Sequence, residues 1–518
     1  MKRRTFLKTA AAGAGYMLSR PMQAGRLSGR VRADASKLAS SLDRRIYGQN
    51  LEFVGRIMEG GIIAEPGSQA PVYGNGFRAD VRSALKEMGV THLRWPGGCF
   101  ADAYDWREGV GPVRKRGKNR MWGKPMFKMV SRFFGESELE WGTEVNNKFG
   151  TPEFIEFCKW MGAEPSLTAS MEPEGPEQAG AWVAYVRENF GSGSVPVWSV
   201  GNEQWNPLEH NSNYSKPERY VKRFHDWAKA MRAADPAIKL VASGGDEQGY
   251  AGWNRVLLEG IGREMDYISC HVYVPADFLA RAIPKDESAY LALAAAYLYL
   301  EDTLTRGRES MTAVLGAPVP VALDEWNLLA TTVSFIRPEN HLREAVAAAG
   351  MIHAILRHAD LVRMADQFSA INSAAASVVT DRDRMIRTPM FHVLRLYATK
   401  SRESVAPAVV DSPSFYTAKL AKLPARTRAP FLDASLTVGS GRATMFLINR
   451  HPRDEMMVEI EVEGIKPGTD AVFEVVSGPD FMSENTWARP ETVIAKSKPM
   501  KWPERILLPA VSVSALST

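Results

Sequence analysis

Two glutamates lie at the ends of short apolar segments that have the composition of buried β-strands. The segments are Val197-Trp-Ser-Val-Gly-Asn-Glu203 and Pro320-Val-Ala-Leu-Asp-Glu-Trp326, so the candidate residues are Glu203 and Glu325. Hydrolysis of a glycosidic bond uses two carboxyl groups, because one protonates the leaving oxygen while the other attacks the anomeric carbon or activates water. A single Gly-Asn-Glu is also typical of a solvated loop or of a residue beside a helix start. The hypothesis therefore depends on elements that bring both glutamates together.

An alternation of strand-like runs with helical patterns, from residue 46 to residue 395, predicts such elements. The strand candidates cover residues 46–53, 92–96, 165–170, 197–203, 239–243, 267–273, 320–326 and 362–369. Helical patterns lie between them, for example at residues 77–87, 152–161, 177–188, 217–234 and 343–358, and two segments, 110–140 and 277–315, look inserted. This alternation predicts an α/β fold, a (β/α)8 TIM barrel over residues 46–395. Its active site would lie at the carboxyl ends of the strands, where both glutamates fall.

The pattern changes after residue 396. Residues 443–449, 456–463 and 471–476 alternate apolar with polar side chains and are separated by turn residues. This favours a C-terminal antiparallel β-sandwich domain over residues 396–518. Residues 25–45, ahead of the first barrel strand, are candidates to contribute to that sandwich.

The N-terminus has the pattern of a twin-arginine export signal. Met1-Lys-Arg-Arg-Thr-Phe-Leu-Lys8 precedes a mild apolar run, and small residues near Ala24 suit cleavage. A signal over residues 1–24 predicts a periplasmic or secreted enzyme; the alternative is a basic amphipathic helix. The signal holds five basic residues and no acid, and the rest of the chain has 59 basic and 59 acidic residues. A neutral surface does not predict a nucleic-acid partner, and it suits an uncharged polysaccharide or oligosaccharide.

Cysteines and metal-ligand spacings do not predict a cofactor. The chain has three cysteines, Cys99, Cys158 and Cys270, for which free thiols are favoured over one disulfide. We see neither zinc-site nor EF-hand spacing, and no apolar stretch long enough to span a membrane. We therefore expect no cofactor, no metal and no membrane partner, while a homo-oligomer stays open.

Longer motifs resemble glycoside hydrolase family 51, which contains retaining α-L-arabinofuranosidases. The most specific is Leu93-Arg-Trp-Pro-Gly-Gly-Cys-Phe-Ala-Asp102, followed by Trp106-Arg107 and Gly109-Val-Gly-Pro112. Further matches are Ile46-Tyr-Gly48 with Glu52, Val200-Gly-Asn-Glu203, His271-Val-Tyr273, Asp324-Glu-Trp-Asn327 and His358-Ala-Asp360. The resemblance covers about residues 46–397 and is looser in the terminal β-domain.

The resemblance implies a role for each matched residue. Glu203 would be the general acid/base and Glu325 the nucleophile of a double displacement. Asn202 would bind the 2-hydroxyl, Arg94 would keep the nucleophile ionised, and His271 and Tyr273 would orient it. Glu52 and Cys99 would contact the sugar; for Cys99 a small buried thiol is an equal alternative.

Two positions depart from the family pattern. Ser369 stands where arabinose-specific members have glutamine, unless Gln367 takes that place, and Leu328-Leu329 stand where many members have tryptophan. Ser369 stays a candidate substrate-binding residue. These departures concern the residues that would contact the sugar, and not the catalytic pair. The alternatives are an endoglucanase- or xylanase-like β-glycanase and a non-catalytic carbohydrate-binding barrel.

Overall fold

The structure is a computed structural model, which describes residues 27–74, 76–120, 144–172, 175–206, 216–245, 252–277, 282–331, 334 and 338–518. The predicted export signal and most of the predicted insertion at 110–140 lie outside these residues. Within the described ranges, no helix is both long enough and apolar enough to cross a membrane.

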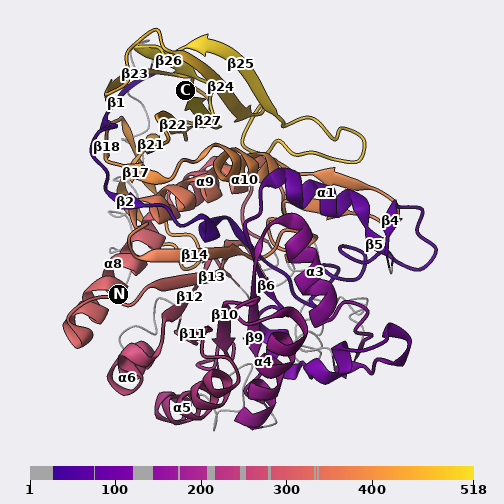
Figure 1. Cartoon of the computed structure of the whole chain (residues 1–518). Helices are drawn as coiled ribbons and strands as arrows, with labels where there is room; N and C mark the ends of the chain where they lie inside the picture. The colour runs from indigo at the N-terminus through magenta and orange to yellow at the C-terminus, as the bar shows by residue number, and fades with distance from the viewer. Residues whose placement is uncertain are drawn as a thin grey trace, which may run out of the picture.

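Eight parallel strands form a closed barrel, which confirms the predicted fold class (Figure 1). In barrel order they are β3 (Gly48–Asn50), β6 (His92–Trp95), β9 (Glu164–Ala169), β10 (Val197–Val200), β11 (Lys239–Ala242), β12 (Tyr267–Pro275), β13 (Val321–Leu329) and β14 (Val362–Gln367). Each overlaps one predicted strand, and β14 pairs with β3 to close the ring.

Helices cover the outside of the barrel. They are α1 (Ala79–Met88), α3 (Thr151–Met161), α4 (Pro176–Phe190), α5 (Pro217–Ala234), α6 (Trp253–Gly260), α7 (Glu287–Ala294), α8 (Tyr297–Leu315), α9 (Leu342–Arg357) and α10 (Pro389–Lys400). The predicted insertion at 277–315 forms α7 and α8. The predicted barrel limit at residue 395 falls inside α10, because apolar residues continue the helix through Tyr397 and Ala398.

The C-terminal part consists of two main packed sheets. One has the order β18 (Ala408–Asp411), β1 (Leu27–Asp34), β23 (Met456–Glu463), β26 (Arg505–Leu508). The other has the order β2 (Ser40–Ser41), β17 (Ser404–Ala406), β21 (Leu432–Gly439), β22 (Arg442–Asn449), β27 (Ser512–Ser517), β24 (Asp470–Ser477), β25 (Ala495–Lys501). The N-terminal strands β1 and β2 therefore lie in these sheets. The β1–β23 pair is parallel, an exception to the predicted antiparallel pattern.

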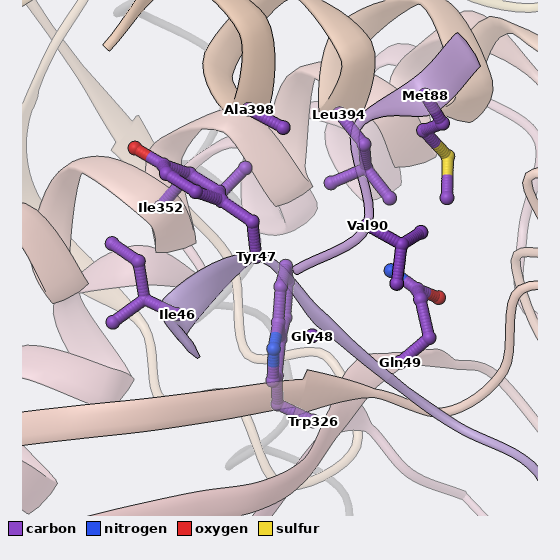
Figure 2. Close-up of a pocket in the computed structure, with 10 residues that line it drawn as sticks. All are labelled: Ile46, Tyr47, Gly48, Gln49, Met88, Val90, Trp326, Ile352, Leu394 and Ala398. Atoms are coloured by element: carbon purple, nitrogen blue, oxygen red, sulfur yellow. The ribbon is translucent and has the colours of Figure 1, made fainter. Parts of the chain in front are cut away.

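Helix α9 lies between the barrel and the sandwich, as Figure 1 shows. Every residue from Leu342 to Leu356 is buried, because the helix has the barrel on one side and the sheet of β21 and β27 on the other. A small cavity of about 10 Å³ remains where α9, α10 and α1 meet β3 and β13 (Figure 2). Trp326 lines this cavity together with Ile352 and Leu394, so its indole packs between the layers.

A buried ion cluster joins α9 to the sandwich. Asp433 on β21 lies 3.0 Å from Nη1 of Arg357, 2.6 Å from Nη2 of Arg450 and 3.3 Å from Nδ1 of His353. Burial alone would raise the pKa of Asp433, but the two guanidinium groups hold it well below its usual value. The carboxylate therefore compensates Arg450 and shares the compensation of Arg357 with Glu301.

We expect Asp433→Asn to destabilise the protein by about 3–5 kcal/mol, because the buried Arg450 loses its counter-charge and Arg357 keeps only Glu301. Chemical denaturation at neutral pH measures this loss. The difference from wild type should narrow below about pH 4, because Asp433 of the unfolded chain then binds a proton that the folded carboxylate, with its lowered pKa, does not bind. Asp470→Asn is the control: this exposed residue pairs with Lys501, and little change is expected. Equal stability of Asp433→Asn and wild type at neutral pH would contradict the role assigned to the cluster.

Candidate active site

A bulge in β13 turns two successive acids toward the barrel interior. Ser269 and His271 of β12 pair with Ala322 and Glu325 of β13, so one residue lies between the paired positions on β12 and two lie between them on β13. Strand β13 also has one residue more than β14 between Leu323 and Trp326. A regular strand would point Asp324 and Glu325 to opposite faces. With the bulge, both contact Arg94, while Trp326 faces the helices.

Glu325 is held by three donors from three strands. Its Oε1 accepts hydrogen bonds from Arg94 (2.8 Å) and from the Asn50 amide (3.3 Å), and its Oε2 accepts one from the Tyr273 hydroxyl (2.6 Å). The side chain is buried, so these donors replace water around the carboxylate. Sequence reasoning placed Arg94 and Tyr273 here but missed Asn50, which has no motif of its own.

Glu203 follows β10 in a left-handed backbone conformation (φ 37°), which is unusual for a residue with a side chain. Its Oε1 lies 2.7 Å from Nδ1 of His271, and its Oε2 accepts a hydrogen bond of 3.0 Å from the Asn206 amide. One oxygen of Glu203, one of Glu325 and a nitrogen of His271 all lie within 4.8 Å of one another. Retaining glycosidases hold their carboxyl groups about 5–5.5 Å apart, whereas inverting enzymes need about 6.5–9.5 Å.

His271 lies between acidic groups on every side. Its Nδ1 is 3.5 Å from Glu325 Oε2, and its Nε2 is 3.4 Å from Asp324 Oδ1. Burial lowers the pKa of His271, but the charges of Glu325 and Asp324 outweigh it and raise the pKa well above its usual value. Burial likewise opposes ionisation of Asp324, yet Arg94 and His271 keep its pKa lowered.

The turn after β6 brings the backbone against the two acids. A Cβ at Gly98 would lie 2.2 Å from Glu325 Oε1, and one at Gly97, with φ 108°, would lie 2.3 Å from the Glu52 Cβ. Only glycine fits at either position. Glu52 accepts a hydrogen bond from the Phe100 N–H (2.8 Å). Burial and the charge of Glu325 raise the pKa of Glu52 to about 8, so this carboxyl carries a proton near neutral pH.

Asp102 supports the segment that carries Glu203. Its Oδ2 accepts hydrogen bonds from the Asn202 N–H (3.4 Å) and the Gln204 side chain (2.9 Å), and its Oδ1 accepts one from the Met171 N–H (2.9 Å). The side-chain oxygen of Asn202 in turn accepts a hydrogen bond of 2.8 Å from Arg94 Nη2. Asp102 is the last residue of the sequence motif that begins at Leu93. The segment around Asn202 that it supports lies about 100 positions later in the sequence.

Other residues singled out from the sequence have different surroundings. Ser369 is fully buried, and its hydroxyl donates to the Ile371 carbonyl (2.9 Å) and accepts from the Ile371 N–H (3.3 Å). Its hydroxyl therefore stabilises a local turn. Leu328 and Leu329 are buried in β13, and Cys99 is partly exposed in the turn after β6.

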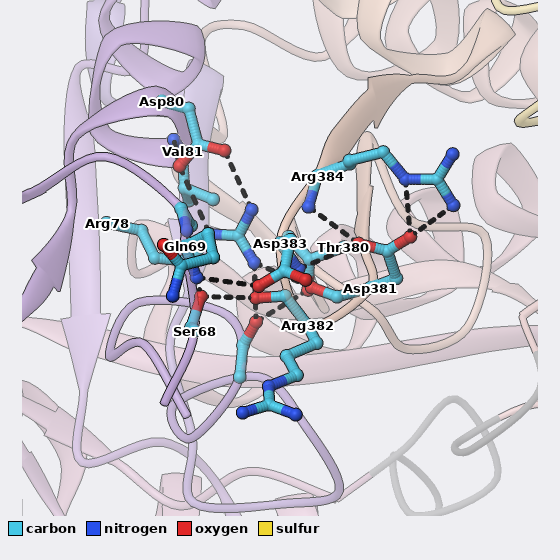
Figure 3. A network of polar contacts seen from close by, with 12 residues as sticks. Ser68, Gln69, Arg78, Asp80, Val81, Thr380, Asp381, Arg382, Asp383 and Arg384 are labelled. Atoms are coloured by element: carbon cyan, nitrogen blue, oxygen red, sulfur yellow. Dashed lines mark hydrogen bonds and ion pairs between the residues drawn. The ribbon is translucent and has the colours of Figure 1, made fainter. Parts of the chain in front are cut away.

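The loops after β3 and β14 are fastened to one another (Figure 3). Arg78 donates to the Asp381 carbonyl (2.7 Å) while its Nη2 pairs with Asp80 (2.7 Å). The Gln69 N–H donates to Asp383 (2.7 Å), and Thr380 donates to the Gly60 carbonyl (2.6 Å). We call these contacts the β3–β14 loop clamp. They hold together two loops at the carboxyl ends of the barrel strands.

A metal could be held only by the central groups, among the residues that the structure describes. Glu203, His271 and Glu325 are the one set of three potential ligand atoms close enough together.

Comparison with known proteins gives this site a family. The model of the α-L-arabinofuranosidase C-terminal domain matches residues 324–514, and that of the α-L-arabinofuranosidase 1 domain matches residues 84–189. Together they span more than half of the chain. The chain belongs to glycoside hydrolase family 51.

Individual relatives of this family 51 protein match over nearly its whole length. It is similar to an intracellular exo-α-L-arabinofuranosidase of Bacteroides ovatus, with 26% identity over 100% of this chain and 99% of the relative. Among solved structures, the α-L-arabinofuranosidase of Thermotoga maritima in an arabinose complex is 26% identical, with a TM-score of 0.78 over 95% of this chain and 100% of that chain. The arabinofuranosidase of Xanthomonas axonopodis pv. citri is 26% identical, with a TM-score of 0.79 over 95% of this chain and 99% of that chain.

We expect His271 to titrate well above the usual histidine range, and at a lower pH in Glu325→Gln, because that variant removes the strongest charge that raises the pKa of His271. NMR of protein with 13C-labelled histidine measures this titration. His392 is an internal control, since burial, Arg395 and Arg387 lower its pKa to about 4, away from Glu325. An unchanged titration of His271 in the variant would contradict the assigned charge coupling.

Proposed function

We propose that the chain is a retaining α-L-arabinofuranosidase that acts on arabinose-containing hemicellulose or oligosaccharides. The observation that carries this proposal is the pair Glu203 and Glu325, with carboxylate oxygens within 4.8 Å, in a member of family 51. The Bacteroides ovatus relative, which bears this activity in its name, matches 100% of this chain, and this supports the same sugar here.

In the first step, Glu325 attacks the anomeric carbon while Glu203 protonates the glycosidic oxygen. The bond to the leaving group breaks, and a covalent bond between sugar and Glu325 forms. Arg94, Asn50 and Tyr273 hold Glu325 in place, so little reorganisation accompanies the attack. His271, with its Nδ1 2.7 Å from Glu203 Oε1, holds the acid/base carboxyl in place.

In the second step, Glu203 removes a proton from water, and the water oxygen attacks the anomeric carbon. The bond to Glu325 breaks and the sugar leaves with its original configuration. The Asn202 side chain, oriented by Arg94, is the candidate partner of the sugar 2-hydroxyl, and Glu52 is the candidate partner of an outer hydroxyl.

The two alternatives differ in what they require. A β-glycanase would use the same pair with a differently shaped sugar site, for which the departures at Ser369 and Leu329 are the argument. A non-catalytic binding barrel does not need three donors around Glu325 or an acid/base beside a histidine. The intact catalytic surroundings therefore favour an enzyme, and the relatives' names favour arabinose over glucose or xylose.

Exchange of each glutamate should affect turnover differently. Glu325→Gln should reduce hydrolysis of every arabinofuranoside to background, because the nucleophile is lost. Glu203→Ala should slow cleavage of arabino-oligosaccharides by about 10²–10⁴-fold, but slow a dinitrophenyl arabinofuranoside far less, because that leaving group needs little protonation. Steady-state kinetics measures both effects, and azide should restore activity of Glu203→Ala with retained configuration.

Glu259→Gln is the matched control, since Glu259 lies on exposed α6 and pairs with Arg255, and it should behave like wild type. Wild-type protein should also be assayed with aryl β-D-xyloside, β-D-glucoside and β-D-galactofuranoside. Preferred cleavage of one of these would favour the β-glycosidase alternative. Wild-type activity in both Glu203→Ala and Glu325→Gln would overturn the mechanism.

We propose separately that residues 1–24 direct export, a proposal that rests on the twin arginine Arg3-Arg4 alone. Several relatives are named as intracellular, which argues against it. Fractionation of bacterial cells that produce the full chain should place the protein in the periplasm, and replacement of Arg3 and Arg4 by lysine should retain it in the cytoplasm. Cytoplasmic localisation of both forms would exclude export by this route.

A further inference from the structure

Asp324 is a second buried acid beside the nucleophile candidate, and the double displacement described above does not use it. A buried carboxylate is costly unless charged or hydrogen-bonding partners surround it. Burial raises the pKa of Asp324, but the charges of Arg94 and His271 outweigh burial and lower it, so the side chain is ionised at neutral pH. The bulge in β13 turns this charge toward the barrel interior, and its place there calls for a role.

Strand β12 supplies two contacts to the Asp324 carboxylate. The Ser269 hydroxyl donates a hydrogen bond to Oδ1 (2.5 Å), and the same oxygen lies 3.4 Å from Nε2 of His271. Ser269 and His271 are two residues apart on the strand, so their side chains lie on the same face. The serine therefore fixes the carboxylate, and the carboxylate faces the ring nitrogen of His271 that does not contact Glu203.

His271 depends on Asp324 more than Arg94 does. The Arg94 Nε also lies 3.4 Å from Asp324 Oδ2, but hydrogen bonds of 2.8 Å to Glu325 and to Asn202 already fix the orientation of the guanidinium. Nε2 of His271 is buried and, within the described part of the chain, makes no hydrogen bond. Its ion pair with Asp324 is therefore the contact that can hold the imidazole ring from that side.

The orientation of this ring determines which carboxylate its other nitrogen meets. Nδ1 of His271 lies 2.7 Å from Glu203 Oε1 and 3.5 Å from Glu325 Oε2. A small rotation of the ring would move Nδ1 away from the acid/base candidate and toward the nucleophile candidate. Tyr273 already donates to that oxygen of Glu325 (2.6 Å). Correct placement of Glu203 therefore requires a fixed ring.

We infer that Asp324 is a positioning residue of the acid/base: its ion pair with Nε2 holds the His271 ring so that Nδ1 meets Glu203. The aspartate of a serine-protease triad orients its histidine in the same way. The inference rests on the proposed function, since it takes Glu203 as the acid/base. Asp324 affects bond cleavage through His271, which lies between the two carboxyl groups.

The dependence on the leaving group tests this assignment. Asp324→Asn keeps the shape of the side chain and removes its charge, so kcat/KM for an arabino-oligosaccharide should fall about 10²-fold, because a misplaced acid protonates a poor leaving group slowly. The kcat/KM for a dinitrophenyl arabinofuranoside should fall less than about 10-fold. Asp226→Asn, on the exposed face of α5, is the control and should alter neither value. Equal losses on both substrates would overturn the assignment, because they would place the effect on the nucleophile.

A double-mutant cycle tests whether Asp324 acts through His271. In a His271→Gln background, adding Asp324→Asn should lower oligosaccharide kcat/KM less than about threefold further, whereas multiplying effects would contradict the inference. Ser269→Ala keeps the charge of Asp324 and removes its hydrogen bond, so it serves even if Asp324→Asn does not fold. It should lower oligosaccharide kcat/KM about 3–10-fold and spare the aryl substrate. An unchanged ratio of the two substrates in Ser269→Ala would also count against the assignment.

Proton NMR without substrate separates this inference from the proposed function. The Nδ1 proton that His271 donates to Glu203 should give a slowly exchanging downfield resonance, assigned by its loss in His271→Gln. The resonance should shift or broaden in Asp324→Asn and stay in place in Asp226→Asn. If wild type cleaves no arabinofuranoside, the proposed function fails, and this resonance still decides whether Asp324 positions the ring. The same resonance in Asp324→Asn and wild type would overturn the inference.

Discussion

The catalytic end of the barrel depends on one buried guanidinium group. Arg94 on β6 donates to Glu325 on β13 and to Asn202 after β10, and its Nε lies 3.4 Å from Asp324. A buried cation is stable only when such partners surround it, and removal of one partner leaves a charge that water cannot reach. Three strands far apart in the sequence must therefore keep their relative heights in the barrel for Arg94 to be satisfied. The same contacts position both the nucleophile candidate and the residue before the acid/base candidate.

The asymmetry around the two glutamates gives each a distinct chemistry. Glu325 accepts hydrogen bonds from a guanidinium, an amide and a phenol, which stabilise negative charge on its oxygens. Glu203 faces the imidazole of His271, whose raised pKa keeps a proton within 2.7 Å of a carboxylate oxygen. A cationic neighbour favours the ionised form of Glu203, the form that acts as the base toward water in the second step, whereas a nucleophile gains from fixed donors. The surroundings thus support the division of roles that the resemblance implied.

Sequence patterns predicted the fold well because each barrel strand is a separate apolar run with a clear end. The eight predicted segments each overlap a barrel strand, and the helices α3, α5 and α9 begin within one residue of their predicted starts. The bulge in β13 could not be predicted, since it depends on pairing with β12 and β14 on both sides. Asn50 and Asp102 were missed as site residues for the same reason: their roles arise only from strands and loops that meet in space.

The loops after β3 and β14 are held by contacts separate from those that hold the catalytic pair. The catalytic contacts come from strand ends and from the short segments directly after them, and these are set by the barrel register. Ser369, at a position expected to read the sugar, is instead buried in its own turn, in the loop that the β3–β14 loop clamp fastens to the loop after β3. A change in these loops alters the sugar-facing wall without disturbing Arg94 or the bulge. A chain about 26% identical to its relatives can therefore keep the same catalytic frame while a few loop side chains determine which sugar that frame accepts.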